Sequence, residues 1–494
     1  MRKILSMTFV AAALAFTGCS DYFDINTNPN SPSSENMTAD IIFPAAEMNL
    51  ATSYGDFLRI VGGYYSQHYA QLTGTSNYLD YSQFMMSATR SSGTYTQLYS
   101  RVLGNLESIR KMASSSEDWG TYLAATTLRA FTFQVLVDCY GETPYTEALN
   151  VAITSPKFDD GETVYKGILA EIDDALGKVS GAENVCSNFL FASQKASAWV
   201  QFANALKLKI MMRMGATGAE LDALVAEGNF PTTDVAWDDC WADEASKSNP
   251  FYAEEFATYF APQKNVSLNL ALYATMAESS DSRLAAFFDA NESSVYVGAV
   301  SGTNYSVSAN THKASYWCRP AVRYDSPVAL ITVAETEFFL CEYYAKKSDM
   351  TSAKAHYEAA IEASFASAGA ADADKVYGTG ADYAWSASHW QELVGVQKWI
   401  ALSGVNNFES WCELRRLKYP EYGTQKASDF YNIQSGAYDV SSYEPGKIYE
   451  PIMVNSKLAS RQVLQRFPYA NSSTSRNSNA PATKSESEPV FWAK

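Results

Sequence analysis

The stretch from Thr121 to Tyr145, TYLAATTLRAFTFQVLVDCYGETPY, places apolar side chains on nearly every face of a predicted helix. Two apolar stripes cover it, formed by Leu128, Phe131, Val135 and Leu136 and by Phe133, Val137 and Tyr140. A helix that is apolar all round is buried, so this segment predicts a core helix. Gly141 supplies the left-handed residue that ends a helix, and Pro144 blocks its continuation.

Residues 338–364, FFLCEYYAKKSDMTSAKAHYEAAIEAS, carry the pattern of a tetratricopeptide repeat. The pattern comprises Leu340, Cys341 and Tyr344 on the first helix and Ala353, Tyr357 and Ala360 on the second. The small residues Cys341, Ala353 and Ala360 let the two paired helices approach, and the tyrosines fill the groove between them. About three repeats are needed for a stable stack, so one clear copy requires others. Helical runs at 164–179 and 196–214 are expected to be further repeats with a degenerate pattern. The sequence therefore predicts a mainly α protein.

The first 18 residues have the layout of a secretory signal, with Arg2 and Lys3 before an apolar run from Ile4 to Phe16. A membrane span needs about 20 apolar residues, so this run is too short for a permanent anchor. The small residues before Cys19 are typical of a bacterial lipoprotein signal, whose cysteine is acylated and becomes the first residue. The alternative is an ordinary signal peptide cut nearby.

Residues 19–40 then form a lipidated tether, because 21–34 are rich in Asn, Pro and Ser and lack a helical period. The acidic SDYFD after Cys19 resembles an export signal to the outer face of the outer membrane. Two stretches of the body also break the helical pattern. Residues 291–320 indicate long loops and a possible hairpin, and the polar tail ends in an apolar VFW expected to dock onto the body.

The formal net charge is −17, and it becomes −19 when the signal with Arg2 and Lys3 is removed. Such a protein repels nucleic acid and anionic membrane surfaces, so contact with the membrane is expected through the lipid only. The 32 Tyr, 25 Phe and 10 Trp exceed what one core absorbs, so some are expected to line a binding surface. The cysteines after Cys19 lack C-x-x-C spacing and indicate buried thiols, although a disulfide or two remains open.

Several stretches together resemble the SusD/RagB family of nutrient-binding outer-membrane lipoproteins. They occur in family order from Cys19 to Trp492 and read CSDYFDINTNPN, LRAFTFQVLVDCYGETPY, QKWIALSGVNNFESWCELRRLKYP, RFPYANSS and PVFW. The third is most similar to the SusD-like lipoprotein branch. The resemblance implies four tetratricopeptide-type helix pairs as a scaffold, an irregular loop-rich ligand face, and a single SusD-like domain over 41–494. It also implies a lid on a SusC-like TonB-dependent transporter.

The third stretch, residues 397–420, also has a purely structural interpretation. Asn406 and Glu409 form a capping-box-like helix start. A core face follows, formed by Phe408, Trp411, Cys412 and Leu414, and cationic residues near the helix C-terminus are Arg415, Arg416 and Lys418. These residues are therefore expected to support the fold rather than to contact a ligand.

No catalytic or metal-binding motif stands out. The sequence has no G-x-S-x-G, H-E-x-x-H or Walker loop, and its four histidines are scattered. Adjacent acidic residues such as Asp173 and Asp174 point apart on a helix and indicate solvated faces. Acidic loops could hold Ca²⁺ but show no diagnostic spacing. No enzyme, metal or cofactor is predicted beyond the lipid on Cys19.

Residues 62–84, GGYYSQHYAQLTGTSNYLDYSQF, alternate aromatic with amide and carboxylate side chains, a composition that suits sugars. The candidate ligand residues here are Tyr64, Tyr65, Tyr69, Tyr78 and Tyr81. The alternative is that these tyrosines pack the grooves of the helix pairs. A second candidate surface lies in or beside the irregular regions and comprises Trp237, Trp241, Tyr316 and Trp317.

The sequence thus predicts a non-catalytic, surface-exposed lipoprotein that captures a glycan, oligosaccharide or peptide for a SusC-like TonB-dependent transporter. One alternative is a surface glycoside hydrolase or other hydrolase, which would need two carboxyl groups about 5 to 9.5 Å apart. The other is a tetratricopeptide-type scaffold that only assembles proteins. Glycan and peptide ligands are not distinguished.

Overall fold

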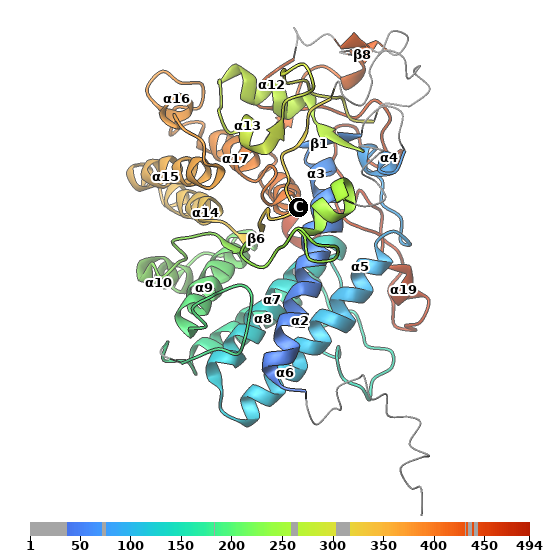
Figure 1. Ribbon diagram of the computed structural model, residues 1–494, viewed down its shortest axis with the longest axis vertical. Coiled ribbons are helices and arrows are strands. Elements are labelled where there is room, and N and C mark those ends of the chain that lie inside the picture. The colour runs from blue at the N-terminus through green and yellow to red at the C-terminus, as the bar shows by residue number, and fades with distance from the viewer. Residues whose placement is uncertain are drawn as a thin grey trace, which may run out of the picture.

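A computed structural model describes residues 37–71, 76–181, 183–257, 265–302, 317–429, 431–432, 437–438 and 443–494. Helices dominate this part of the chain, and its strands are only two to four residues long and occur in pairs. In Figure 1 the long helices occupy the lower half and the left side, whereas short helices and strands gather in the upper part. The predicted mainly helical architecture is confirmed.

Eight of the described helices form four consecutive pairs. They are α6 (Gly104–Ser115) with α7 (Trp119–Tyr140), α8 (Gly161–Leu176) with α9 (Ala196–Arg213), α14 (Val333–Lys346) with α15 (Met350–Ala368), and α17 (Trp390–Ala401) with α18 (Asn407–Leu417). Helix α7 packs on both α8 and α9, and α14 packs on both α9 and α17. The four pairs implied by the family resemblance are therefore present as one continuous scaffold.

Helix α7 is the core helix that the sequence predicts. All of its residues after Trp119 are buried. It begins at Asp118, whose carboxylate accepts a hydrogen bond from the backbone N–H of Thr121 at 3.1 Å. It ends at Gly141, which has a φ of 78° that a residue with a side chain rarely adopts.

The α14–α15 pair confirms the tetratricopeptide-type pattern. Cys341, Ala353 and Ala360 are fully buried where the two helices approach. The ring of Tyr357 fills the groove beside them and its hydroxyl donates to the backbone oxygen of Tyr383 at 2.8 Å. Tyr344 lies at the edge of the pair, where its ring stacks on the ring of His356.

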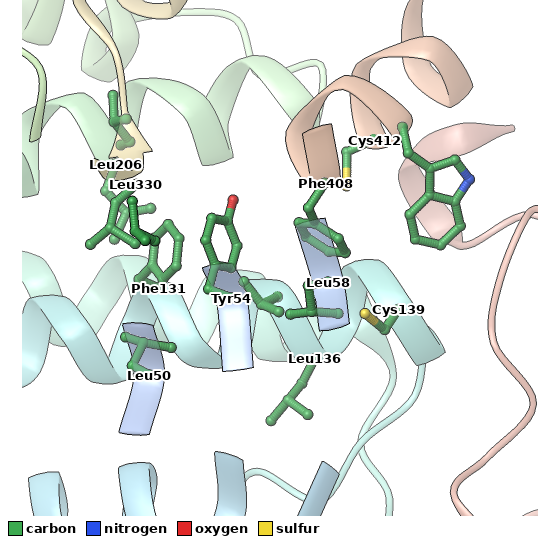
Figure 2. Packing of buried hydrophobic residues seen from close by; sticks show 14 of the residues in the cluster. Leu50, Tyr54, Leu58, Phe131, Leu136, Cys139, Leu206, Leu330, Phe408 and Cys412 are labelled. Carbon is green, nitrogen blue, oxygen red and sulfur yellow. The ribbon is translucent and has the colours of Figure 1, made fainter. Parts of the chain in front are cut away.

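A long helix near the N-terminus of the described chain joins the two halves of the scaffold. It consists of α2 (Ala39–Ser53), the π-helical turn η2 (Tyr54–Leu58) and α3 (Arg59–Tyr65). Figure 2 shows the ring of Tyr54 between the side chains of Phe131 on α7 and Phe408 on α18, with ring centroids 5.2 Å and 5.6 Å away, respectively. The Tyr54 hydroxyl donates to Asn406 Oδ1 at 2.9 Å, so one side chain ties three helices together.

Helices α3 and α18 cross at Gly62. A Cβ added there would lie 2.5 Å from the backbone atoms of Phe408, which is shorter than real Cβ contacts. The crossing therefore requires glycine, and the close approach brings the N-terminal end of α18 against α3. Asn406 caps that end by accepting from the backbone N–H of Glu409 at 3.3 Å, as predicted.

Short elements complete the described structure. The remaining helices are α4 (Leu79–Ser82), α5 (Ser92–Gln97), η3 (Leu98–Leu103), α10 (Ala219–Glu227), α11 (Pro250–Tyr252), η4 (Ala253–Ala257), α12 (Leu270–Glu278), α13 (Leu284–Phe287), α16 (Asp374–Tyr377), η6 (Ala427–Asp429), α19 (Asn471–Thr474) and η7 (Phe491–Ala493).

The strands form five two-stranded sheets in the described part of the chain. The antiparallel pairs are β1 (Tyr69–Gln71) with β3 (Val266–Leu268), β2 (Val235–Trp237) with β6 (Val328–Ile331), β4 (Phe288–Asp289) with β5 (Arg319–Pro320) and β8 (Tyr431–Asn432) with β9 (Ala437–Tyr438), and the parallel pair is β7 (Glu421–Tyr422) with β10 (Lys447–Ile448). The β4–β5 pair lies at the two ends of the region predicted as long loops.

The C-terminal segment packs into the core. The ring of Phe467 stacks on that of Trp411, with centroids 5.2 Å apart and planes 15° apart. Trp492 donates from Nε1 to Asp138 Oδ1 at 2.9 Å. The predicted docking of the VFW tail is therefore confirmed. All six cysteines of the described chain are free thiols, and four of them are buried: Cys139, Cys318, Cys341 and Cys412.

Buried charged side chains meet where α7, α9, α14, α17 and α18 converge, and we call them the buried ion cluster. Its members are Asp138, Lys209, Arg213, Glu335, Glu342, Lys398, Glu409, Glu413 and Arg416. Arg213 is central, because its guanidinium pairs with Asp138 at 2.7 Å, with Glu413 at 2.9 Å and with Glu409. Burial opposes the charge on Glu413, but Arg416, Lys398 and Arg213 together hold its pKa well below the usual range.

Candidate functional site

The predicted tyrosine surface is wrong, because its side chains lie in the core. Tyr64, Tyr65 and Tyr69 have exposed fractions of 0%, and those of Tyr78 and Tyr81 are 6% and 3%. The physical reason is that α3 is covered by α18, α4 and β1, so these rings pack on one another and on the C-terminal segment. Burial is the alternative that the sequence left open, although the rings fill the surroundings of α3 rather than a groove within a helix pair.

The second predicted surface is also not assembled. Trp317 is 2% exposed and Trp237 is fully buried, so neither offers a ring to a ligand. Trp241 is partly buried and donates from Nε1 to the backbone oxygen of Trp237 at 2.8 Å. Tyr316 and the lipid-anchor candidate Cys19 lie outside the described residues.

A different set of aromatic side chains is partly or largely exposed around α11, η4 and the segment after β5, and we call it the aromatic ridge: Tyr252, Phe256 and Tyr324. The first two project from α11 and η4, where their rings stack with centroids 5.9 Å apart and planes only 4° apart. Tyr324 is 37% exposed, and its backbone oxygen accepts from the N–H of Asn249 at 2.6 Å. A flat pair of rings on a partly solvated surface is suited to stacking against a flat ligand.

Fixed charges border the aromatic ridge. The guanidinium of Arg319 lies 4.5 Å from the centroid of the Phe256 ring. Arg323 pairs with Asp289 through an Nη2 to Oδ1 distance of 2.8 Å, and both side chains remain about half exposed, at 56% and 44%. The antiparallel β4–β5 pair sets this arrangement, because Asp289 is the register partner of Arg319. These groups can donate and accept hydrogen bonds beside the rings.

A cleft of about 680 Å³ is lined in part by the segment 321–327, which also carries Arg323 and Tyr324. Alanine and valine side chains line much of it, together with Thr232, Thr233, Ser326 and Arg59. Arg59 is only 5% exposed, and its guanidinium lies 5.0 Å from the Phe251 ring centroid and donates to the Gly404 carbonyl. An apolar cavity with a few polar groups is typical of small-molecule sites.

Two π-helical turns bring acidic side chains together beneath the ridge. Burial, reinforced by the neighbouring charges of Glu254 and Glu255, raises the pKa of Asp56 to about 8. Burial also raises the pKa of Glu255, although Arg319 opposes this at 3.7 Å. Within the described ranges, no group of three or more His, Cys, Asp or Glu residues could hold a metal ion. Asp56 on η2 therefore lies beside the two acids of η4, and their negative charges favour its protonated form.

Sequence reasoning missed the aromatic ridge because its residues are spread over the chain. Tyr252 and Phe256 are four residues apart, so both lie on one side of the short helical segment that begins at Pro250. That spacing after an Asn-Pro start was the available signal. Arg323 and Tyr324 belong to an irregular segment with no periodicity to indicate exposure.

The structure is thus a scaffold of paired helices that carries partly exposed aromatic side chains on its short connecting elements. A family model described as "Starch-binding associating with outer membrane", named SusD-like, matches residues 29–435. The chain therefore belongs to the SusD-like family. Among the described residues, no helix is long and apolar enough to cross a membrane.

Solved structures share this fold over most of both chains. A SusD homologue from Bacteroides uniformis has a TM-score of 0.70 and 20% identity, over 92% of this chain and 99% of that one. A chitin-binding SusD homologue from Flavobacterium johnsoniae has a TM-score of 0.72 and 18% identity, over 91% and 98%. A SusD homologue from Bacteroides thetaiotaomicron has a TM-score of 0.68 and 19% identity, over 91% and 98%. No curated protein sequence matches the chain.

Proposed function

We propose that the protein is a lipoprotein of the outer membrane that binds a glycan at the loop-rich face and delivers it to a SusC-like TonB-dependent transporter. The observation that carries this proposal is the family match over residues 29–435, whose description names starch binding and the outer membrane. Two proteins of the same fold are described as chitin-binding, which supports a glycan over a peptide.

The aromatic ridge offers the chemistry that a glycan needs. The stacked rings of Tyr252 and Phe256 would cover the apolar C–H face of a sugar. The exposed Arg323–Asp289 pair would exchange hydrogen bonds with hydroxyl groups on the sugar's edge. The cleft lined in part by segment 321–327 would hold a further part of an oligosaccharide. No step of this role requires bond cleavage, so the protein is proposed to be non-catalytic.

Replacing Tyr252 with alanine is expected to weaken glycan binding up to tenfold, because an aromatic stacking contact contributes about 0.5–1.5 kcal/mol. Isothermal titration of starch and chitin oligosaccharides first identifies a ligand and then compares the variant with the parent. Trp119→Ala is the matched control, since Trp119 is partly buried at the start of α7, on the helical scaffold. Equal losses in both variants would refute the ridge as the binding surface.

The same oligosaccharides separate the alternative functions. Product release during the titration would support a hydrolase. A stable complex with another protein in the absence of any soluble ligand would support an assembly scaffold. Peptides of similar length are tested in the same way. If the protein binds a peptide and no glycan, the proposed ligand class is wrong, but the proposed transport role is unaffected.

The anchor and the transporter are tested on the intact protein. A C-terminal tag should recover it from outer membranes in near-equal amount with a TonB-dependent barrel, and mass spectrometry should find acyl chains on Cys19. The Cys19→Ser variant should be released from the membrane, because it lacks the thiol on which the acyl anchor would form. Recovery of lipidated protein without a barrel would contradict the transport role.

A further inference from the structure

A second pocket of about 440 Å³ lies between the C-terminal end of α18 and the β7–β10 pair. Leu414, Ile448 and Val463 form an apolar part of its lining. Its volume is within the range of small-molecule sites. None of its lining residues belongs to the aromatic ridge or to the 680 Å³ cleft. We call it the basic pocket, for the charges described next.

Three cationic side chains from two segments line the basic pocket: Arg415, Lys418 and Arg461. Glu421 is the only acidic side chain among the described lining residues, and its Oε2 pairs with Lys447 at 3.1 Å. The lining is therefore strongly positive on a protein whose net charge is −17. Such a concave, like-charged surface attracts anions.

Arg415 is a buried cation that lacks a carboxylate partner. Its exposed fraction is 1%, and it forms no ion pair with a carboxylate of the described residues. Its N–H groups donate to the backbone oxygens of Asp138 at 2.9 Å, Gln465 at 2.7 Å and Trp411 at 3.3 Å, and to the sulfur of Cys412. A guanidinium has five N–H groups and four of them have these partners, so one N–H is left for a ligand.

The positive charge of Arg415 is not neutralised by the tryptophan rings and backbone carbonyls around it. The Arg415 guanidinium lies 3.6 Å from the Trp411 centroid and 4.8 Å from that of Trp492, which holds it in place. A guanidinium stays protonated in proteins, and a buried charge is stable only when paired or fully hydrogen-bonded. An anion in the pocket would supply the missing countercharge.

Two further groups converge on the same pocket. Lys418 donates from Nζ to the Ala493 carbonyl at 2.6 Å, and burial together with the charge of Arg415 lowers its pKa. The hydroxyl of Tyr422 is buried and has no hydrogen-bond partner in the described part of the chain. An ammonium and a phenol beside a guanidinium provide donors for both oxygens of a carboxylate and for a neighbouring hydroxyl.

We propose that the basic pocket binds a small organic carboxylate of monosaccharide size, with the carboxylate near Arg415 and Lys418 and the body of the ligand against the apolar lining. A hexuronate is a suitable probe of this class, because it carries one carboxylate on a ring of monosaccharide size. The pocket would act independently of the glycan site at the aromatic ridge.

Titration of the full protein with sodium D-glucuronate and with D-glucose tests the proposal, because the two sugars differ in a carboxylate at one carbon. Glucuronate is expected to bind at least tenfold more tightly, and glucose of equal affinity would overturn the proposal. Sodium sulfate that binds as tightly as glucuronate would overturn the carboxylate assignment, since it would show attraction of charge alone.

Variants then locate the site. Lys418→Gln combined with Arg461→Gln is expected to weaken glucuronate binding at least tenfold, and both side chains are exposed enough for the fold to survive. Lys166→Gln is the matched control for lost charge, because Lys166 is exposed on α8. Tyr252→Ala should leave glucuronate affinity unchanged. Loss of glucuronate binding in that variant would instead place the sugar on the aromatic ridge and refute the pocket.

Discussion

Replacing Arg213 with methionine is expected to lower the free energy of unfolding by about 3–5 kcal/mol, because removing one partner of a buried ion pair leaves the other charges uncompensated. Urea unfolding at pH 7, followed by circular dichroism, measures the loss. The expected effect is as large as that of a severe core substitution, because three carboxylates face this one guanidinium.

The three carboxylates would not be affected equally. Asp138 would keep hydrogen bonds from Trp492 and from the hydroxyl of Tyr165. Among the described residues, Glu409 would keep only Lys209 as a cationic partner, at 3.3 Å. We therefore expect the contact between α9 and α18 to weaken most, which would loosen the junction between the second and fourth helix pairs.

The matched control is Lys166→Met, which removes an exposed partner of Glu162 on α8 and should cost less than about 1 kcal/mol. Arg213→Lys keeps the charge but loses the forked geometry, so its loss should fall between the two. A loss for Arg213→Met no larger than that of Lys166→Met would show that the cluster contributes nothing to stability. If Arg213→Met does not fold, the Arg213→Lys comparison still decides the question.

The scaffold could be predicted from the sequence because its signals are local. The apolar faces of 121–140 and the small residues at Cys341, Ala353 and Ala360 reflect contacts along one helix or between neighbours in sequence. The buried ion cluster was less accessible. Lys209 and Arg213 are isolated charges in an otherwise apolar segment, which indicates that they pair with carboxylates when buried. Their partner Glu409 lies about 200 residues away on α18, so the sequence does not identify it.

The binding surface could not be predicted because exposure is a tertiary property. Tyr65 and Tyr252 lie in equally aromatic segments, and no local pattern shows that α18 and the C-terminal segment cover the first and leave the second partly open. The composition predicted that some aromatic residues line a binding surface, and this stays a prediction. The sequence pattern placed them on α3, where the close crossing at Gly62 draws the helix into the core.

The Asp56→Asn variant is expected to be more stable than the parent at pH 8.5 and equally stable at pH 4. Burial raises the pKa of Asp56 from 3.8 to about 8, so between these values the folded state holds a proton that the unfolded chain has released. The carboxyl group therefore makes the parent progressively less stable as pH rises from about 4 to 8. Asparagine has a similar shape and carries no charge, so it escapes that loss.

The stability gain at pH 8.5 should be roughly 2–3 kcal/mol. Each pKa unit corresponds to about 1.4 kcal/mol, and the residual solvent contact of Asp56 reduces the full value by about half. The gain also includes relief for Glu254 and Glu255, whose negative charges reinforce the pKa shift of Asp56.

Urea unfolding of both proteins at half-unit steps from pH 4 to 9 measures the difference, and Asp239→Asn serves as an exposed control that should leave the profile unchanged. A stability gain that is constant with pH would mean that asparagine improves packing and that the carboxyl group does not titrate in this range. A gain that grows with pH would show that the two π-helical turns beneath the aromatic ridge are held together best when Asp56 is protonated, so that the geometry of the ridge depends on pH.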